Sequence, residues 1–147
     1  MIEGLRDELY LRMAIEEAKK STSIDGYHVG AIIVKDRDIL PRAYSGENSD
    51  YNHAEEWAIA RYNGKLQGAI IYITMEPCNI RRSKRKACCD WIIKSGINRV
   101  VFGVYDPDTY VKCNGADRLQ KAGVEVCHLR KLEMICKELT PTLLFGV

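Results

Sequence analysis

Apolar residues recur along the chain with two spacings, one typical of helices and one typical of buried strands. Leu11, Ala14, Ile15 and Ala18 follow an i, i+3, i+4, i+7 pattern, so the segment 5–20 is expected to form an amphipathic helix. Near-continuous apolar runs are typical of strands that are buried on both faces. Two such runs are found at 29–34 and 69–74, and a further strand is expected at 99–104.

Shorter patterns fill the intervals between these elements. The segment 38–45 is expected to return as a second strand, and Pro41 places that strand at a sheet edge or at a bulge. Further helices are expected at 53–62, 88–96, 116–123 and 129–139, and a last strand at 124–129. The tightly joined first two strands should be antiparallel, whereas later strands need crossovers and should be parallel. The alternation predicts a three-layer α/β/α fold with a mixed five-stranded sheet, in a single domain spanning residues 1–147.

Composition limits the class of protein. Of 147 residues, 46% are apolar and 29% are charged, which fits one globular domain and excludes wholesale disorder. The net charge of +2 does not by itself indicate a nucleic-acid partner. No apolar run reaches the roughly 18 residues of a membrane span, and the first ten residues lack a signal-peptide pattern, which favours a cytoplasmic location. The six cysteines are therefore expected to be metal ligands and buried thiols rather than disulfides.

Candidate chemistry gathers at the start of two predicted helices and at the end of one strand. His53-Ala54-Glu55 opens a helix, Glu76-Pro77-Cys78 follows the next strand, and Cys88-Cys89 opens the helix after it. Such positions meet at one edge of an open α/β sheet, and His nitrogen with Cys sulfur is a typical zinc donor set. The order H-x-E and then P-C-x-x-C is the signature of zinc deaminases, in which the Glu moves protons and is not a metal ligand.

Each part of this signature is weak by itself. An H-A-E tripeptide arises by chance in many helices, and a single cysteine is most often a small buried apolar residue. Residues i and i+2 of a regular helix also diverge, so His53 and Glu55 can share a site only at the first turn. The second cysteine stands ten positions after Cys78 rather than three, and the sequence alone allows Cys89 to replace Cys88.

The segment 74–83 carries a longer pattern, T-M-E-P-C-N-x-R-x-S, and nine residues separate Cys78 from Cys88. With these motifs, the chain from Asp7 to about Leu129 resembles the cytidine deaminase-like superfamily, and within it the fungal type of riboflavin-biosynthesis pyrimidine deaminase. The resemblance implies Zn²⁺ held by His53, Cys78 and Cys88, with Glu55 as the proton shuttle. It also implies a homodimer or larger homo-oligomer. The substrate contacts that it suggests are Asn79, Arg81, Ser83, Ser45 and Glu47, and chain position adds His28 as a further candidate.

The sequence departs from the family in the basic run 81–86, which holds five positive charges in six residues. Beside an active site such a run is suited to a phosphate, on a nucleotide or on a nucleic-acid backbone.

Three functions therefore stay open. The first is hydrolytic deamination of a phosphorylated riboflavin-pathway diaminopyrimidine, with a ribityl or ribosyl group. The second is deamination of another base, in a cytidine or dCMP-type nucleotide or in nucleic acid, although residues 79–88 offer no aromatic side chain for stacking. The third is a zinc module without catalysis, which would need Cys89 as a fourth ligand.

Overall fold

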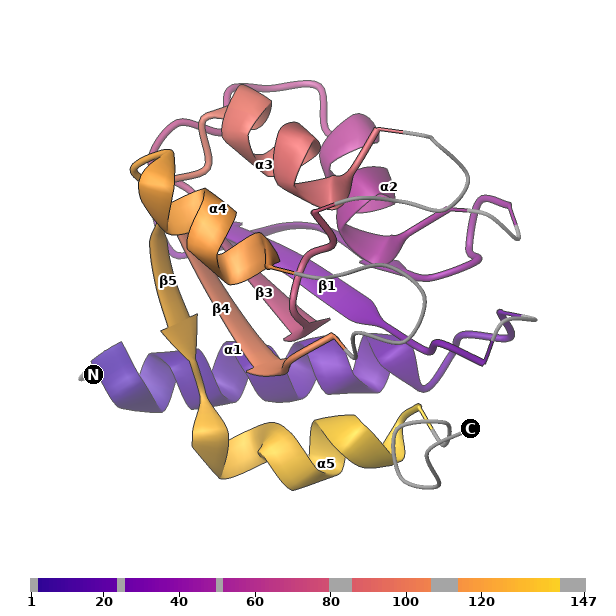
Figure 1. Cartoon of the computed structure of the whole chain (residues 1–147). Coiled ribbons are helices and arrows are strands. Elements are labelled where there is room, and N and C mark those ends of the chain that lie inside the picture. Colours follow the sequence, from indigo (N-terminus) through magenta and orange to yellow (C-terminus); the bar gives the residue numbers. More distant parts are fainter. Residues whose placement is uncertain (1–2, 24–25, 50–51, 80–85, 107–113, 141–147) are drawn as a thin grey trace.

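A five-stranded sheet lies between two layers of helices (Figure 1). The computed structural model describes residues 3–23, 26–49, 52–79, 86–106 and 114–140. The strands are β1 (Gly30–Lys35), β2 (Asp38–Tyr44), β3 (Ile70–Met75), β4 (Arg99–Val104) and β5 (Glu125–His128). Helices α2 (Ala54–Ala60), α3 (Cys88–Ser95) and α4 (Gly115–Lys121) cover one face, and α1 (Glu3–Ala18) and α5 (Glu133–Glu138) cover the other. This arrangement confirms the predicted α/β/α fold.

The sheet has the strand order β2-β1-β3-β4-β5 and is mixed, as expected. β1 pairs antiparallel with both of its neighbours, whereas β3, β4 and β5 are parallel. The tight turn between β1 and β2 uses Asp36 and Arg37 at positive φ, a backbone conformation that matches the twist of a two-residue hairpin. Pro41 lies in the edge strand β2, where the register with β1 shifts, so both expectations for this proline are confirmed.

The core lies on both faces of the sheet, with α1 packed on one face and α2, α3 and α4 on the other. β4 is buried along its whole length, which explains its near-continuous apolar sequence. A Cβ atom on Gly30 would lie 2.0 Å from the carbonyl oxygen of Ala14. Only a glycine at this position lets α1 approach β1 so closely.

Each predicted helix differs from the structure by one or two residues at one or both ends, and two of these differences are instructive. The predicted helix 129–139 is divided into a 3-10 turn, Arg130–Leu132, and the α-helix α5. The predicted helix 53–62 begins one residue later, because His53 is extended and only caps α2. The residue that caps a helix is set by its backbone dihedral angles, and the spacing of apolar residues carries no information about those angles. None of the helices in the described ranges is long and apolar enough to cross a membrane.

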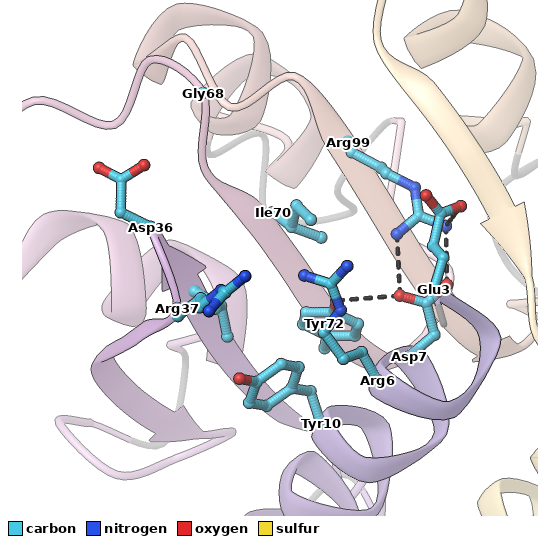
Figure 2. Close-up of a pocket in the computed structure, with 11 residues that line it drawn as sticks. Glu3, Arg6, Asp7, Tyr10, Asp36, Arg37, Gly68, Ile70, Tyr72 and Arg99 are labelled. Atoms are coloured by element: carbon cyan, nitrogen blue, oxygen red, sulfur yellow. Dashed lines mark hydrogen bonds and ion pairs between the residues drawn. The ribbon is translucent and has the colours of Figure 1, made fainter. Parts of the chain in front are cut away.

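A buried ion pair joins α1 to the beginning of β4. Asp7 accepts two hydrogen bonds from the Arg99 guanidinium, at 2.8 and 2.7 Å, and a third from the Tyr72 hydroxyl at 2.9 Å. These residues line one wall of a pocket of about 280 Å³, shown in Figure 2. Because Arg99 and Ile70 are the first residues of their strands, this pocket lies at the end of the sheet opposite to the residues that follow β3.

Candidate active site

His53 and Glu55 share one site because His53 is not part of the helix. His53 has φ −83° and ψ 153°, which is extended backbone, and α2 begins at the next residue. The divergence of i and i+2 side chains therefore does not apply to this pair. The backbone N–H of His53 donates to Glu56 Oε1 at 3.2 Å, which holds the residue at the helix start. The Glu55 side chain is buried in the first turn.

Three ligand atoms from three separate segments converge on one point. His53 Nδ1 lies 3.2 Å from Cys88 Sγ and 3.7 Å from Cys78 Sγ. Cys78 follows β3 after two residues, and Cys88 is the first residue of α3. All three ligand atoms lie within 4.8 Å of one another, in the one cluster of the described residues that could hold a metal ion.

The chemistry of this donor set fits zinc. Zinc is a borderline-soft ion that binds imidazole nitrogen and soft thiolate sulfur, and three protein ligands are typical of zinc sites that leave a position for water. A hydrogen bond with Cys88 lowers the pKa of the Cys78 thiol to about 4, aided by His53 and opposed by burial. The backbone N–H of Cys88 also donates to Cys78 Sγ at 3.2 Å. Cys78 is thus held in surroundings that favour a thiolate, which is the form that binds metal.

The Glu55 carboxyl lies beside the three ligand atoms. Burial raises its pKa to about 7, while the charge of His53 and a hydrogen bond with Cys88 act in the opposite direction. A carboxyl group that is shielded from bulk water and adjacent to a metal site is suited to accept and return protons.

The two adjacent cysteines point to different neighbours. Cys89 Sγ lies 3.7 Å from the carbonyl oxygen of Pro77 and 3.6 Å from that of Gly115. Burial raises the pKa of the Cys89 thiol to about 12, so it stays neutral. The geometry therefore places Cys88 with His53 and Cys78 in the metal cluster, meaning the three ligand side chains, and places Cys89 at the start of α4. The sequence alone did not distinguish Cys88 from Cys89 as the third ligand.

The loop after β3 is fixed against two later segments, and sequence reasoning missed the residues that do this. Glu76 accepts hydrogen bonds from the backbone N–H of Asp106 at 3.2 Å and of Ala116 at 2.9 Å. A Cβ atom on Gly115 would lie 1.9 Å from the carbonyl oxygen of Pro77. The glutamate of the E-P-C motif thus anchors the loop that carries Cys78, although the motif alone did not indicate this task.

The predicted substrate residues before α2 have contacts within the protein. The Ser45 hydroxyl donates to the Tyr27 carbonyl at 2.8 Å and accepts from the Val29 N–H at 3.0 Å. Glu47 accepts from the Tyr44 N–H at 3.2 Å and pairs with Arg61 at 3.2 Å. These contacts hold the loop together, and a role of Ser45 or Glu47 in substrate binding stays a prediction.

Three further predicted substrate contacts are His28, before β1, and Arg81 and Ser83, in the loop after Cys78. His28 is half-buried before β1, and its backbone N–H donates to Thr140 Oγ1 at 3.3 Å. Arg81 and Ser83 lie outside the described residues, as does the basic run apart from Lys86, whose ammonium lies 5.1 Å from the ring centroid of Trp91. The substrate roles of His28, Arg81 and Ser83 stay predictions.

Asn79, the residue after Cys78, is held by α4. Its Oδ1 accepts a hydrogen bond from Arg118 Nη1 at 3.1 Å, and its Nδ2 donates to Asn114 Oδ1. Arg118 is a residue that sequence reasoning missed, because its position in an ordinary amphipathic helix gave no signal of a contact with the cysteine loop.

Comparisons with known proteins match the chain to a family of deaminases. Residues 5–104 match the family model of the cytidine and deoxycytidylate deaminase zinc-binding region. The chain is 45% identical over 125 residues to the diaminohydroxyphosphoribosylamino-pyrimidine deaminase of Schizosaccharomyces pombe, covering 81% of this chain and 31% of that protein. A protein of the same name from Buchnera aphidicola (strain APS) is 38% identical over 122 residues, covering 82% of each chain.

A solved structure extends the likeness to the fold. The crystal structure of a diaminohydroxyphosphoribosylaminopyrimidine deaminase/5-amino-6-(5-phosphoribosylamino)uracil reductase from Thermotoga maritima matches with a TM-score of 0.87 at 33% identity. The match covers 99% of this chain and 42% of that one. The chain thus spans less than half of this protein and 31% of the fission-yeast protein.

Proposed function

The chain belongs to the cytidine and deoxycytidylate deaminase zinc-binding family, and from that premise we propose that it catalyses the hydrolytic deamination of a phosphorylated diaminopyrimidine. The observation that carries the proposal is the convergence of His53 Nδ1 with two cysteine sulfurs beside the buried Glu55. The relatives named diaminohydroxyphosphoribosylamino-pyrimidine deaminase support the substrate class. A ribosyl or ribityl phosphate would provide the anion for which the basic run 81–86 is suited.

We assign the metal ligands to His53, Cys78 and Cys88. A zinc ion in such a site supplies Lewis acidity, which lowers the pKa of a bound water to around 7. Cys89 supplies no fourth sulfur, because its thiol is directed at the carbonyl oxygens of Pro77 and Gly115. This direction argues against a closed, purely structural zinc site.

Glu55 would move the protons of the reaction. Its carboxylate takes one proton from the attacking water, whose oxygen forms a bond to the ring carbon that bears the amino group. The carboxyl returns this proton to the neighbouring ring nitrogen. It then transfers the second water proton to the amino group, the C–N bond breaks, and ammonia leaves a ring carbonyl behind. Burial of Glu55 keeps bulk water from competing for these protons.

Ammonia release from the purified, zinc-loaded protein tests this function. The substrates to compare are the phosphorylated diaminopyrimidine, cytidine, dCMP and a short single-stranded oligonucleotide. We expect turnover of the diaminopyrimidine and none after Glu55→Ala. Turnover of dCMP or of the oligonucleotide alone would replace the proposed substrate with another base. Turnover that survives Glu55→Ala would overturn the assignment of the site.

The cytoplasmic location, the homo-oligomeric state and the single domain spanning residues 1–147 stay predictions. Sedimentation of the purified protein at several concentrations would measure the oligomeric state. Limited proteolysis followed by mass mapping would show whether the chain resists cleavage as one unit.

A further inference from the structure

A network of polar side chains connects α4 with both cysteine segments. The Arg118 guanidinium donates through Nη1 to Asn79 Oδ1 at 3.1 Å and forms an ion pair with Asp90 through Nη2. Asn79 Nδ2 donates in turn to Asn114. Asp90 also accepts from the backbone N–H of Ala87 at 3.2 Å, at the N-cap of α3. Arg118 therefore contacts the residue after Cys78 and, through Asp90, the start of the helix that begins with Cys88.

The shape of the guanidinium explains why an arginine suits this position. Its donors point in fixed directions in one plane, so one nitrogen can serve a neutral amide while another serves a carboxylate. A lysine has a single nitrogen and cannot reproduce both contacts in this geometry. Asp90 compensates the charge of Arg118, so the pair is suited to hold a neutral neighbour rather than to capture a phosphate.

The two contacts of Asn79 fix the orientation of its carboxamide. An asparagine side chain offers two N–H donors and two acceptor lone pairs. Arg118 uses one lone pair and Asn114 accepts one N–H, so a 180° flip of the amide would break both hydrogen bonds. The second N–H and the second lone pair are then the groups that can pair with the N–H/C=O edge of a pyrimidinone ring.

We propose that Arg118 is a positioning residue of the deaminase site, which acts through Asn79 by fixing its carboxamide next to Cys78 for pairing with the pyrimidinone edge of the substrate. This inference rests on the proposed function, because it assigns Asn79 to the substrate of that reaction. It names a residue of α4 outside the metal cluster and gives it a task in substrate recognition.

Steady-state kinetics with the phosphorylated diaminopyrimidine test the substrate side of the proposal. We expect Arg118→Lys and Asn79→Ala each to raise KM by about tenfold, the usual effect of losing one hydrogen bond to a charged or fixed partner. Zinc content and melting temperature should stay at the wild-type values. The KM of the double variant should be no higher than that of Asn79→Ala alone, because the proposal routes the effect of Arg118 on the substrate through Asn79. Lys121→Ala is the matched control on α4, since Lys121 is exposed and, among the described residues, forms an ion pair with Asp117.

A measurement without turnover tests the positioning itself. In ¹⁵N-labelled protein, the Asn79 side-chain amide is identified as the signal that Asn79→Ala removes. We expect this amide to be ordered in the wild type and in Lys121→Ala, and to become mobile in Arg118→Lys. The proposal would be overturned if Arg118→Lys left the Asn79 amide signal unchanged or left KM unchanged. It would also be overturned if the KM increases of the two single variants multiplied in the double variant. If the wild type deaminates no pyrimidine, the proposed function fails together with the substrate side of this inference, while the amide signal still decides whether Arg118 orients Asn79.

Discussion

Two neighbouring cysteines at the start of α3 have different chemical surroundings. Cys88 Sγ lies 3.2 Å from His53 Nδ1, whereas Cys89 Sγ faces two backbone carbonyls. We predict that Cys88→Ser loses zinc and that Cys89→Ser retains it. Mutation of a residue that only hydrogen-bonds to a metal ligand lowers metal affinity by about 10–100-fold. Removal of a ligand itself should lower the zinc affinity by at least as much.

Metal analysis of the two purified variants measures this difference directly. Cys89→Ser serves as the matched control, because the serine hydroxyl can donate to the same carbonyl oxygens as the thiol. Zinc that remains in Cys88→Ser but is lost in Cys89→Ser would reverse the ligand assignment.

Glu55 allows a second prediction at the scale of one side chain. Glu55→Gln preserves the size of the buried side chain but removes its ability to take a proton. We expect kcat to fall by about 10²–10⁴-fold, the usual contribution of a positioned acid/base, with unchanged zinc content. Parallel assays of ammonia release and bound metal separate the two effects. A Gln variant that keeps its rate would show that another group moves the protons.

At the scale of elements, the metal cluster depends on how α4 packs against the loop after β3. We predict that Gly115→Ala destabilises the protein by at least about 2 kcal/mol, because the new methyl group would meet the Pro77 carbonyl oxygen at 1.9 Å and overpacking is costly. The displaced loop carries Cys78, so zinc affinity should fall as well. Urea unfolding and a competitive zinc titration measure the two quantities.

Gly4→Ala is a suitable control for this prediction. Gly4 lies in α1, and a Cβ atom there would meet nothing within 4 Å. We expect its stability to be unchanged or slightly higher, since alanine favours a helix more than glycine does. Equal effects of the two substitutions would mean that the contact with Pro77 is not the cause.

The elements could be predicted from the sequence more completely than the contacts between them. Apolar runs such as 29–34 identify buried strands because a buried strand must be apolar on both faces. On a regular helix the i, i+2 spacing would direct His53 and Glu55 to different sides, but His53 lies outside the helix and the two side chains share one site. A cap is a matter of one pair of backbone angles, which a period of 3.6 residues does not encode.

At the scale of the whole molecule, the two ends of the sheet have separate tasks. One end carries the metal cluster after β3, and the other holds the ion pair of Asp7 with Arg99 (Figure 2). These two residues stand 92 positions apart, so no local pattern could predict their contact. The zinc-binding motifs could be recognised because each is a short, contiguous stretch of sequence. Their convergence on one site depends on the fold.

The separation of the two ends leads to a prediction about global stability. Asp7→Asn removes the buried carboxylate that accepts from Arg99 and Tyr72. Because Arg99 keeps its ion pairs with Glu3 and Glu125, we expect the free energy of unfolding to fall by about 1–3 kcal/mol. Urea unfolding should show this loss, while zinc content and ammonia release stay at wild-type values, because the pair lies far from the cluster along the strands. Glu125→Gln is the control: Glu125 pairs with the same arginine but is 65% exposed, so we expect a loss below about 1 kcal/mol. Equal losses in the two variants would mean that burial does not set the strength of this network, and a loss of zinc in Asp7→Asn would mean that the two ends of the sheet are coupled.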